Sequence, residues 1–508
     1  MGCEALVIHP RWFIMLEFRG FARQDRFLPK LLSLLAAPRR GNLSEVAIGS
    51  HGQFRSVKNP YFPDADKDRA AAFYAGHFDL AGHSVKSRTD EVFLQQQQPE
   101  AWQEAMHSLA WLHDFAAEPK RLHACFVSRL MAAWCQITPK ATDYSGELKR
   151  LNVLTNTLPA IASLLNATQQ QPLLAALKRQ CWRVRKQSPR QACDIIRQQT
   201  ALLVAYMAHD ELMPHTQEAE NKLEAALLRE VMADGGPRAS PLPKYIDAAI
   251  DLFDMADTWA LNKSPLSPVT LTSIDRMARF IAMFLQSDRD LIVAGCLPLS
   301  AAVIQRLTRQ KPLICAAQSG FASLAHKATG LVIAWPKRQT DHWIDVTLAG
   351  LAFGVFSAFL TDAKGSSATV QLSPDHESCD KRGSLFDVVW LGCRRQIFVG
   401  PAGDDIRVED TLDPTEFLHH MTFVPHPGVK FSIGHTGQSA NFMLADKTAW
   451  TLTVRGARIE QNGLGTLAFS AKGTDGNKVN WALRKLAGPK PPLRRSKIVD
   501  EATPQLPF

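Results

Sequence analysis

The sequence predicts an α+β multidomain fold, in which stacked antiparallel helix pairs are followed by an antiparallel β-sandwich. The chain has 508 residues, which is more than one compact core usually holds, so two domains are expected. Apolar residues recur at helical spacing from residue 100 to about residue 287, and short strand-like segments replace them from residue 290. With 46% hydrophobic and 21% charged residues, the composition is that of a globular protein.

Amphipathic segments of helical length make up the first half of the chain. In PEAWQEAMHSLAWLHDF, for example, Trp102, Met106 and Leu109 fall on one stripe. Similar segments continue as far as FIAMFLQ (280–286), and helix-breaking sequences such as Gly235–Gly236–Pro237 separate them. Helix pairs of this kind stack into a closed toroid or into an open superhelical solenoid, and the pattern alone favours neither.

The second half consists of short strand-like segments, such as FDVVWLG and WTLTVRG, joined by turn sequences such as GPAGDD and QNGLG. Their regular spacing predicts an antiparallel sandwich. Within it, the stretch Gln318–Trp335 predicts a hairpin whose turn lies at Thr329–Gly330.

These patterns divide the chain into four predicted regions. Residues 1–60 form a basic, irregular N-terminal extension, residues 61–289 a helical domain, and residues 290–487 a β-sandwich domain. Residues 488–508 are rich in proline and basic residues and are expected to be a disordered tail.

The net charge of +9 favours polyanionic partners such as nucleic acid, anionic membrane or acidic polysaccharide. The alternative is that this charge has no specific functional meaning. KRQCWRVRKQ (178–187) is a basic helix face that either attracts a polyanion or is simply solvated. A helical array that binds nucleic acid is supported by charge alone, and no nucleic-acid motif accompanies it. Nucleic acid is therefore not the expected partner.

Nine cysteines occur without CxxC spacing, which indicates buried thiols in a reducing compartment rather than disulfides or a zinc site. We expect no metal and no cofactor. The opening MGCEALVIHPRWF lacks the basic start of a signal peptide, and no segment is apolar for long enough to span a bilayer. The expectation is a soluble, cytoplasmic protein, with the periplasm or cell envelope as the alternative.

Eight strings in order over roughly residues 65–485 resemble the heparinase II/III family, and more closely a subgroup found in alphaproteobacteria. They are YAGHFDLAGHSV, HSLAWLHDF, VMADGGPRAS, IDRMARFIAMF, QSGFASLAHKATGLVIAW, TLAGLAFGVFSA, IRVEDTL and FVPHPGVK. The resemblance implies a bacterial protein with an N-terminal (α/α) toroid of antiparallel helix pairs and a C-terminal heparinase II/III-like β-sandwich.

Family members of known activity are polysaccharide lyases that cleave uronic-acid-containing chains by β-elimination. The resemblance therefore implies a lyase with an acidic, glycosaminoglycan-like polysaccharide as its partner. Such chemistry needs a group that neutralises the uronate carboxylate, a base for the C5 proton and an acid for the leaving oxygen. The alternative is a catalytically degenerate glycan-binding or envelope-assembly protein on the same scaffold.

Several positions depart from the family pattern. Phe321 stands where relatives have the tyrosine of SGYQRL, and Gln318 where they have a histidine. Pro237 and Leu348 replace the histidines of DGGH and AHAG. Phenylalanine, proline and leucine carry no titratable group, so whether the chain is an enzyme stays open.

The catalytic candidates are therefore Tyr206, His209 and His342. Tyr206 stands three residues before His209, so both could share a helix face; alternatively Tyr206 is a core aromatic and His209 caps the helix end. His342 could replace a lost histidine, and its neighbour Trp343 could stack on a sugar or pack in the sandwich core.

The remaining candidates are predicted to bind substrate. Asp234 precedes the glycines of a substrate-facing turn, and Arg238 could hold a uronate carboxylate with both guanidinium arms, or be solvated. Gln318, Trp343 and His426 complete the set. His419 and His420 point to opposite faces of a strand, so they do not suggest a metal site.

Overall fold

The structure is a computed structural model of the chain, and the residues it describes all belong to one compact unit, Gly52–Phe508. The predicted N-terminal extension lies outside them apart from residues 52–56, and the predicted tail lies outside them entirely. The described residues are 52–56, 65–87, 91–95, 97–137, 143–261, 265–285, 299–311, 313, 315–326, 329–334, 342–348, 351–361, 373–380, 383–390, 393–412, 418–462, 465–472 and 478–486.

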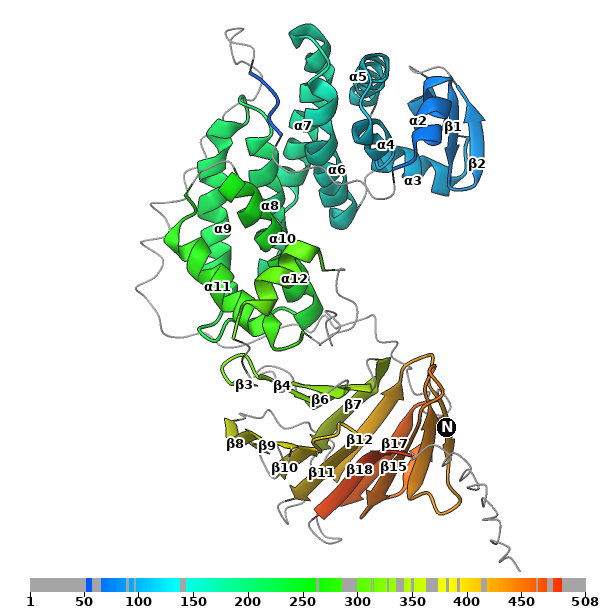
Figure 1. Ribbon diagram of the computed structural model, residues 1–508, viewed down its shortest axis with the longest axis vertical. Helices are drawn as coiled ribbons and strands as arrows, with labels where there is room; N and C mark the ends of the chain where they lie inside the picture. The colour runs from blue at the N-terminus through cyan, green and yellow to red at the C-terminus, as the bar shows by residue number, and fades with distance from the viewer. Residues whose placement is uncertain are drawn as a thin grey trace, which may run out of the picture. The chain divides into compact units, whose positions relative to one another are not determined.

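The helical part opens with α2 (Lys67–Tyr74), the hairpin β1 (His77–Leu80) and β2 (His83–Lys86), and the short helix η1 (Val92–Leu94). In Figure 1 its helices run from blue to green. The helices that follow are α3 (Glu100–Ser108), α4 (Leu112–Ala117), α5 (Arg121–Gln136), α6 (Tyr144–Ala162), α7 (Ala167–Lys186), α8 (Ala192–Met207), η2 (Met213–His215), α9 (Thr216–Glu230), α10 (Leu242–Leu261), α11 (Pro268–Ala282) and α12 (Ala301–Thr308).

Alternate helices pack on one another, which builds two layers. In one layer α4 packs on α6, α6 on α8 and α8 on α10; in the other α5 packs on α7 and α9 on α11. Helix α8 is buried on nearly all sides because it contacts both layers. The described helices satisfy the helix-pair prediction, and none of them is long and apolar enough to cross a bilayer.

Two antiparallel sheets form the second part, as predicted. One has the order β16-β17-β12-β7-β6-β5-β4-β3 and the other β13-β14-β15-β18-β11-β10-β9-β8. The strands are β3 (Cys315–Ala316), β4 (Phe321–His326), β5 (Thr329–Ala334), β6 (His342–Leu348), β7 (Leu351–Thr361), β8 (Ser373–Asp380), β9 (Gly383–Trp390), β10 (Cys393–Val399), β11 (Asp405–Leu412), β12 (Leu418–Pro425), β13 (Lys430–Ile433), β14 (Ser439–Met443), β15 (Ala449–Arg455), β16 (Ile459–Gln461), β17 (Leu467–Lys472) and β18 (Lys478–Lys485).

The inner faces of the two sheets share one apolar core. Phe356 of β7 stacks on Trp481 of β18, with ring centroids 4.5 Å apart. An ion pair lies on this inner face, where Arg395 donates from Nε and Nη2 to the Asp410 carboxylate at 2.6 and 2.8 Å. Helices followed by a β-sandwich confirm the predicted fold class.

The predicted hairpin is present, but its turn is not where the sequence placed it. Thr329 pairs with His326 and Gly330 with Ala325, so both residues open β5. The Thr329 hydroxyl donates to the carbonyl oxygen of Gly403, which holds this residue in the sheet. A β-branched threonine suits a strand better than a tight turn.

Strands β4 and β5 are covered on both faces. Phe321 packs edge-on against Phe280 of α11, with centroids 5.7 Å apart, and belongs to the helical core. Its neighbour Ala322 belongs to the sandwich core. Because side chains alternate along a strand, this sheet edge joins two apolar cores.

Candidate functional site

Three of the four positions that depart from the family pattern, Phe321, Pro237 and Leu348, are buried. Phe321 is 5% exposed and contacts the rings of Phe280 and Phe284. Pro237 is buried, and Leu348 is fully buried in the sandwich core. None of these side chains can exchange a proton, so these positions do not supply elimination chemistry.

Asp234 and the turn that holds Gln318 come together. The Asp234 carboxylate accepts from the Ser319 backbone N–H and hydroxyl, each at 2.9 Å, and from the Gly236 N–H at 3.2 Å. A Cβ on Gly236 would meet the Ser319 Oγ at 2.1 Å, so this approach requires glycine. Asp234 therefore ties the helical part to the β4 turn, while Gln318 itself is exposed.

Two other predicted binding residues, Arg238 and His426, make contacts elsewhere. Arg238 is exposed, and its Nε donates to the carbonyl oxygen of Arg229 at 2.9 Å. His426 is exposed after β12, where its Nδ1 accepts from the Gly428 N–H at 3.4 Å. His342 and Trp343 begin β6, and their side chains lie outside the described part, so their roles stay predictions.

Tyr206 and His209 do not pair. Helix α8 ends at Met207, so the helical spacing that relates the two residues stops before His209. The His209 ring packs edge-on against Phe54 at 4.8 Å, and its Nδ1 accepts from the Glu211 N–H at 3.1 Å. Tyr206 lies against His215 instead, with centroids 5.6 Å apart.

Tyr206 and His215 line a cavity of about 370 Å³ between α7, α8 and α9. This volume is in the range of small-molecule sites. Glu218 accepts from Arg185 at 3.1 Å and from Lys222 at 2.7 Å, so it holds both cations at the cavity. The charged and titratable lining consists of Arg185, Tyr206, His215, Glu218, Lys222 and Arg229, an excess of cations over carboxylates.

Burial sets the protonation states in this cavity. It raises the pKa of Tyr206 well above its ordinary value, and the charge of Arg185 opposes part of that rise. Burial, followed by the Arg185 charge, lowers the pKa of His215. At neutral pH the phenol is therefore protonated and the imidazole neutral, which makes them a potential proton donor and acceptor.

Sequence reasoning identified Tyr206 but missed Arg185, His215, Glu218 and Lys222. His215 follows Tyr206 by nine residues and Pro214 lies between them, so only the chain reversal between α8 and α9 brings the rings together. The basic run 178–187, which contains Arg185, is the available signal for the cations. Among the described residues, no three His, Cys, Asp or Glu side chains are arranged to hold a metal ion.

No family model and no curated protein matches the sequence, whereas several solved structures match the fold. A mutant of the heparan sulfate lyase HepC of Pedobacter heparinus has a TM-score of 0.58 at 11% identity, covering 86% of this chain and 87% of that one. A heparinase III structure gives 0.58 at 10% identity, with coverage of 86% and 87%. The heparinase III BT4657 gene product gives 0.58 at 11% identity, with coverage of 84% and 86%. The chain therefore has a heparinase III-like fold, helices followed by a β-sandwich.

Proposed function

We propose that this chain is a lyase-like protein that acts on an acidic, uronate-containing polysaccharide in the cavity between α7, α8 and α9. The observation that carries the proposal is the convergence of Arg185, Tyr206 and His215 on one cationic cavity. The fold shared with heparan sulfate lyases supports a polysaccharide as the ligand. Anionic glycans also suit the net charge of +9.

The cavity offers each group that β-elimination needs. Arg185 and Lys222 face the uronate carboxylate and neutralise it, which makes the C5 proton more acidic. The neutral His215 accepts this proton, and the electron pair forms the C4–C5 double bond as the bond from C4 to the glycosidic oxygen breaks. Tyr206 donates its phenolic proton to the leaving oxygen.

Substituting the proton-transfer pair tests this mechanism. Tyr206→Phe and His215→Asn are each expected to slow formation of the unsaturated uronate by on the order of 10²–10⁴-fold, the usual contribution of general acid–base catalysis. The reaction is followed by ultraviolet absorbance with a panel of acidic glycans. Tyr74→Phe is the matched control. The Tyr74 ring also lies against a histidine, with its centroid 5.1 Å from that of His123, but Tyr74 is exposed and does not line this cavity. Full activity in Tyr206→Phe would contradict the assigned role.

The pH profile gives an independent prediction. His215 must be neutral to act as a base, and its pKa lies below the ordinary value of 6.5. We therefore expect kcat/KM to fall, as the imidazole gains a proton, at a lower pH than it would for a histidine of ordinary pKa. In His215→Asn, the remaining kcat/KM should no longer show this decrease at acidic pH.

The apolar packing of Phe321, Pro237 and Leu348 favours a second candidate, a non-catalytic glycan-binding or envelope-assembly protein. This candidate predicts that acidic glycans bind without any unsaturated product. Binding would still weaken in Arg185→Ala, whereas Tyr206→Phe would leave it nearly unchanged. Calorimetric titration of the same variants therefore separates the two candidates.

A further inference from the structure

A second and larger cavity lies at the other end of the helical part, between η1, α3, the end of α5 and the start of α6. Its volume is about 1260 Å³, which exceeds the roughly 300–1,000 Å³ of most small-molecule sites. The buried rings of Phe93 and Trp102 form an apolar wall. The polar lining includes Gln95, Gln103, Glu104, His107, Asp143 and Lys149.

The charge of this lining differs from that of the Tyr206 cavity. Glu100, Glu104 and Asp143 contribute carboxylates, against the cations of Lys149 and Arg150. Arg150 is already paired with the buried Glu147 at 3.2 Å. Such a lining disfavours a polyanion, whereas carboxylate and amide side chains are well suited to hydroxyl groups.

His107 supplies a polar atom that lacks a partner within the described part of the chain. Its Nδ1 is buried and makes no hydrogen bond there, while its ring lies 5.7 Å from that of Phe93. Burial and the nearby Arg150 charge lower the pKa of His107 to about 4, so the ring is neutral at neutral pH. Leaving a buried polar atom unpaired is costly. The rest of the ring is partly exposed at the cavity, so a small rotation of the ring brings Nδ1 within reach of a sugar hydroxyl, which either tautomer can bond.

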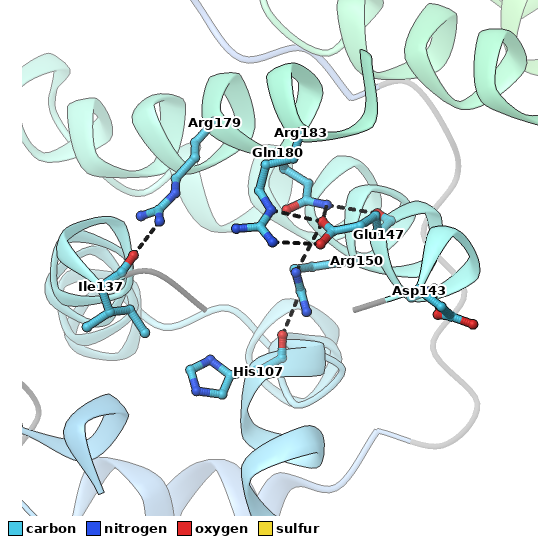
Figure 2. A network of polar contacts seen from close by, with 9 residues as sticks. His107, Ile137, Asp143, Glu147, Arg150, Arg179, Gln180 and Arg183 are labelled. Atoms are coloured by element: carbon cyan, nitrogen blue, oxygen red, sulfur yellow. Dashed lines mark hydrogen bonds and ion pairs between the residues drawn. The ribbon is translucent and has the colours of Figure 1, made fainter. Parts of the chain in front are cut away.

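A buried network fixes the walls of the cavity (Figure 2). Glu147 of α6 accepts from Gln180 at 2.8 Å and from Arg183 at 2.7 Å, both on α7. Glu147 also holds Arg150, whose Nε donates to the carbonyl oxygen of His107 at 2.7 Å. These bonds tie the end of α3 to α6 and α7.

The end of α5 is held in the same way. Arg179 of α7 donates to the carbonyl oxygens of Trp134, Cys135 and Ile137. Ile137 lines the cavity. Both walls are therefore positioned before any ligand arrives, which lowers the entropic cost of binding.

We propose that this cavity binds an uncharged, hydroxyl-rich segment of a polysaccharide, with His107 as a hydrogen-bonding residue and the Phe93 wall packed against a sugar ring. The site goes beyond the proposed elimination, since it takes sugars that carry no carboxylate. Its size suits a ligand of more than one sugar unit.

Neutral oligosaccharides of the chito- and cello- series are the probes, titrated calorimetrically into the full chain. We expect binding in at least one series. His107→Phe keeps the ring beside Phe93 and removes the polar atom, so it should weaken binding about tenfold. Glu104→Ala alters an exposed lining residue and should weaken binding without affecting folding. Glu118→Ala is the matched control, because Glu118 is equally exposed but does not line the cavity.

The proposal is overturned if neither series binds, or if His107→Phe and Glu104→Ala bind as tightly as Glu118→Ala. Uronate oligosaccharides serve as the counter-probe. Their binding or cleavage should respond to Arg185→Ala and not to His107→Phe. The two proposals, the elimination site and the neutral-sugar site, can therefore be supported or contradicted independently of each other.

Discussion

Glu147→Ala is expected to lower the free energy of unfolding of the helical part by about 3–5 kcal/mol, the range seen when one partner of a buried ion pair is removed. The Glu147 side chain is 1% exposed and compensates Arg150, which is 2% exposed, and Arg183, which is 16% exposed. The alanine variant leaves two guanidinium groups in a poorly solvated interior without their carboxylate. It also removes one of the two acceptors of Gln180 Nε2, whose bond to the Glu147 carbonyl oxygen remains, and it weakens the attachment of α3 through Arg150.

Urea denaturation followed by far-ultraviolet circular dichroism measures this effect. Glu118→Ala is the control, because it breaks an ion pair with Lys67 that is exposed to solvent and should therefore cost far less stability. Equal stability losses in the two variants would show that the buried network contributes no more than a surface pair. Neutral oligosaccharide binding should also fall in Glu147→Ala, since the cavity wall is no longer fixed.

Arg395→Met is expected to destabilise the sandwich by a similar amount, about 3–5 kcal/mol. The side chains of Arg395 and Asp410 are 2% and 0% exposed and face each other across β10 and β11. Methionine fills much of the volume but leaves the Asp410 carboxylate in an apolar core without its guanidinium.

The double variant Arg395→Met/Asp410→Leu provides the control for this pair. Because it removes both charges, it should recover most of the stability that Arg395→Met loses. Lys478→Ala, which breaks the more exposed pair with Glu409, should cost less than about 1 kcal/mol. A double variant less stable than Arg395→Met would contradict the assigned origin of the effect.

The two-part fold could be predicted because its signals are local. Helical spacing and strand alternation report directly on which side of each element is buried. The hairpin β1–β2 and helix α12 are shorter than the windows in which such periodicity can be recognised. The turn after β4 was misplaced because Gly330 suggests a turn, whereas pairing with β6 extends the strand through it.

The candidate site was less predictable because it depends on contacts between distant segments. Tyr206 could be singled out from its helix, but its neighbour His215 comes from beyond a chain reversal. The His209 pairing failed because α8 ends at Met207, before the expected spacing is complete. The Glu147 network joins residues 33 to 43 positions apart, which no short pattern reveals.

The strand pair β4–β5 has a practical consequence for anyone who divides this protein for expression. Phe321, Val332 and Ala334 belong to the helical core, while Leu324 and Ile333 belong to the sandwich core. A recombinant sandwich produced alone would present a phenylalanine and its aliphatic neighbours to solvent and would tend to aggregate. The helical part produced alone would expose to solvent the apolar surface that β4 and β5 cover. The two halves therefore need to be synthesised as one polypeptide.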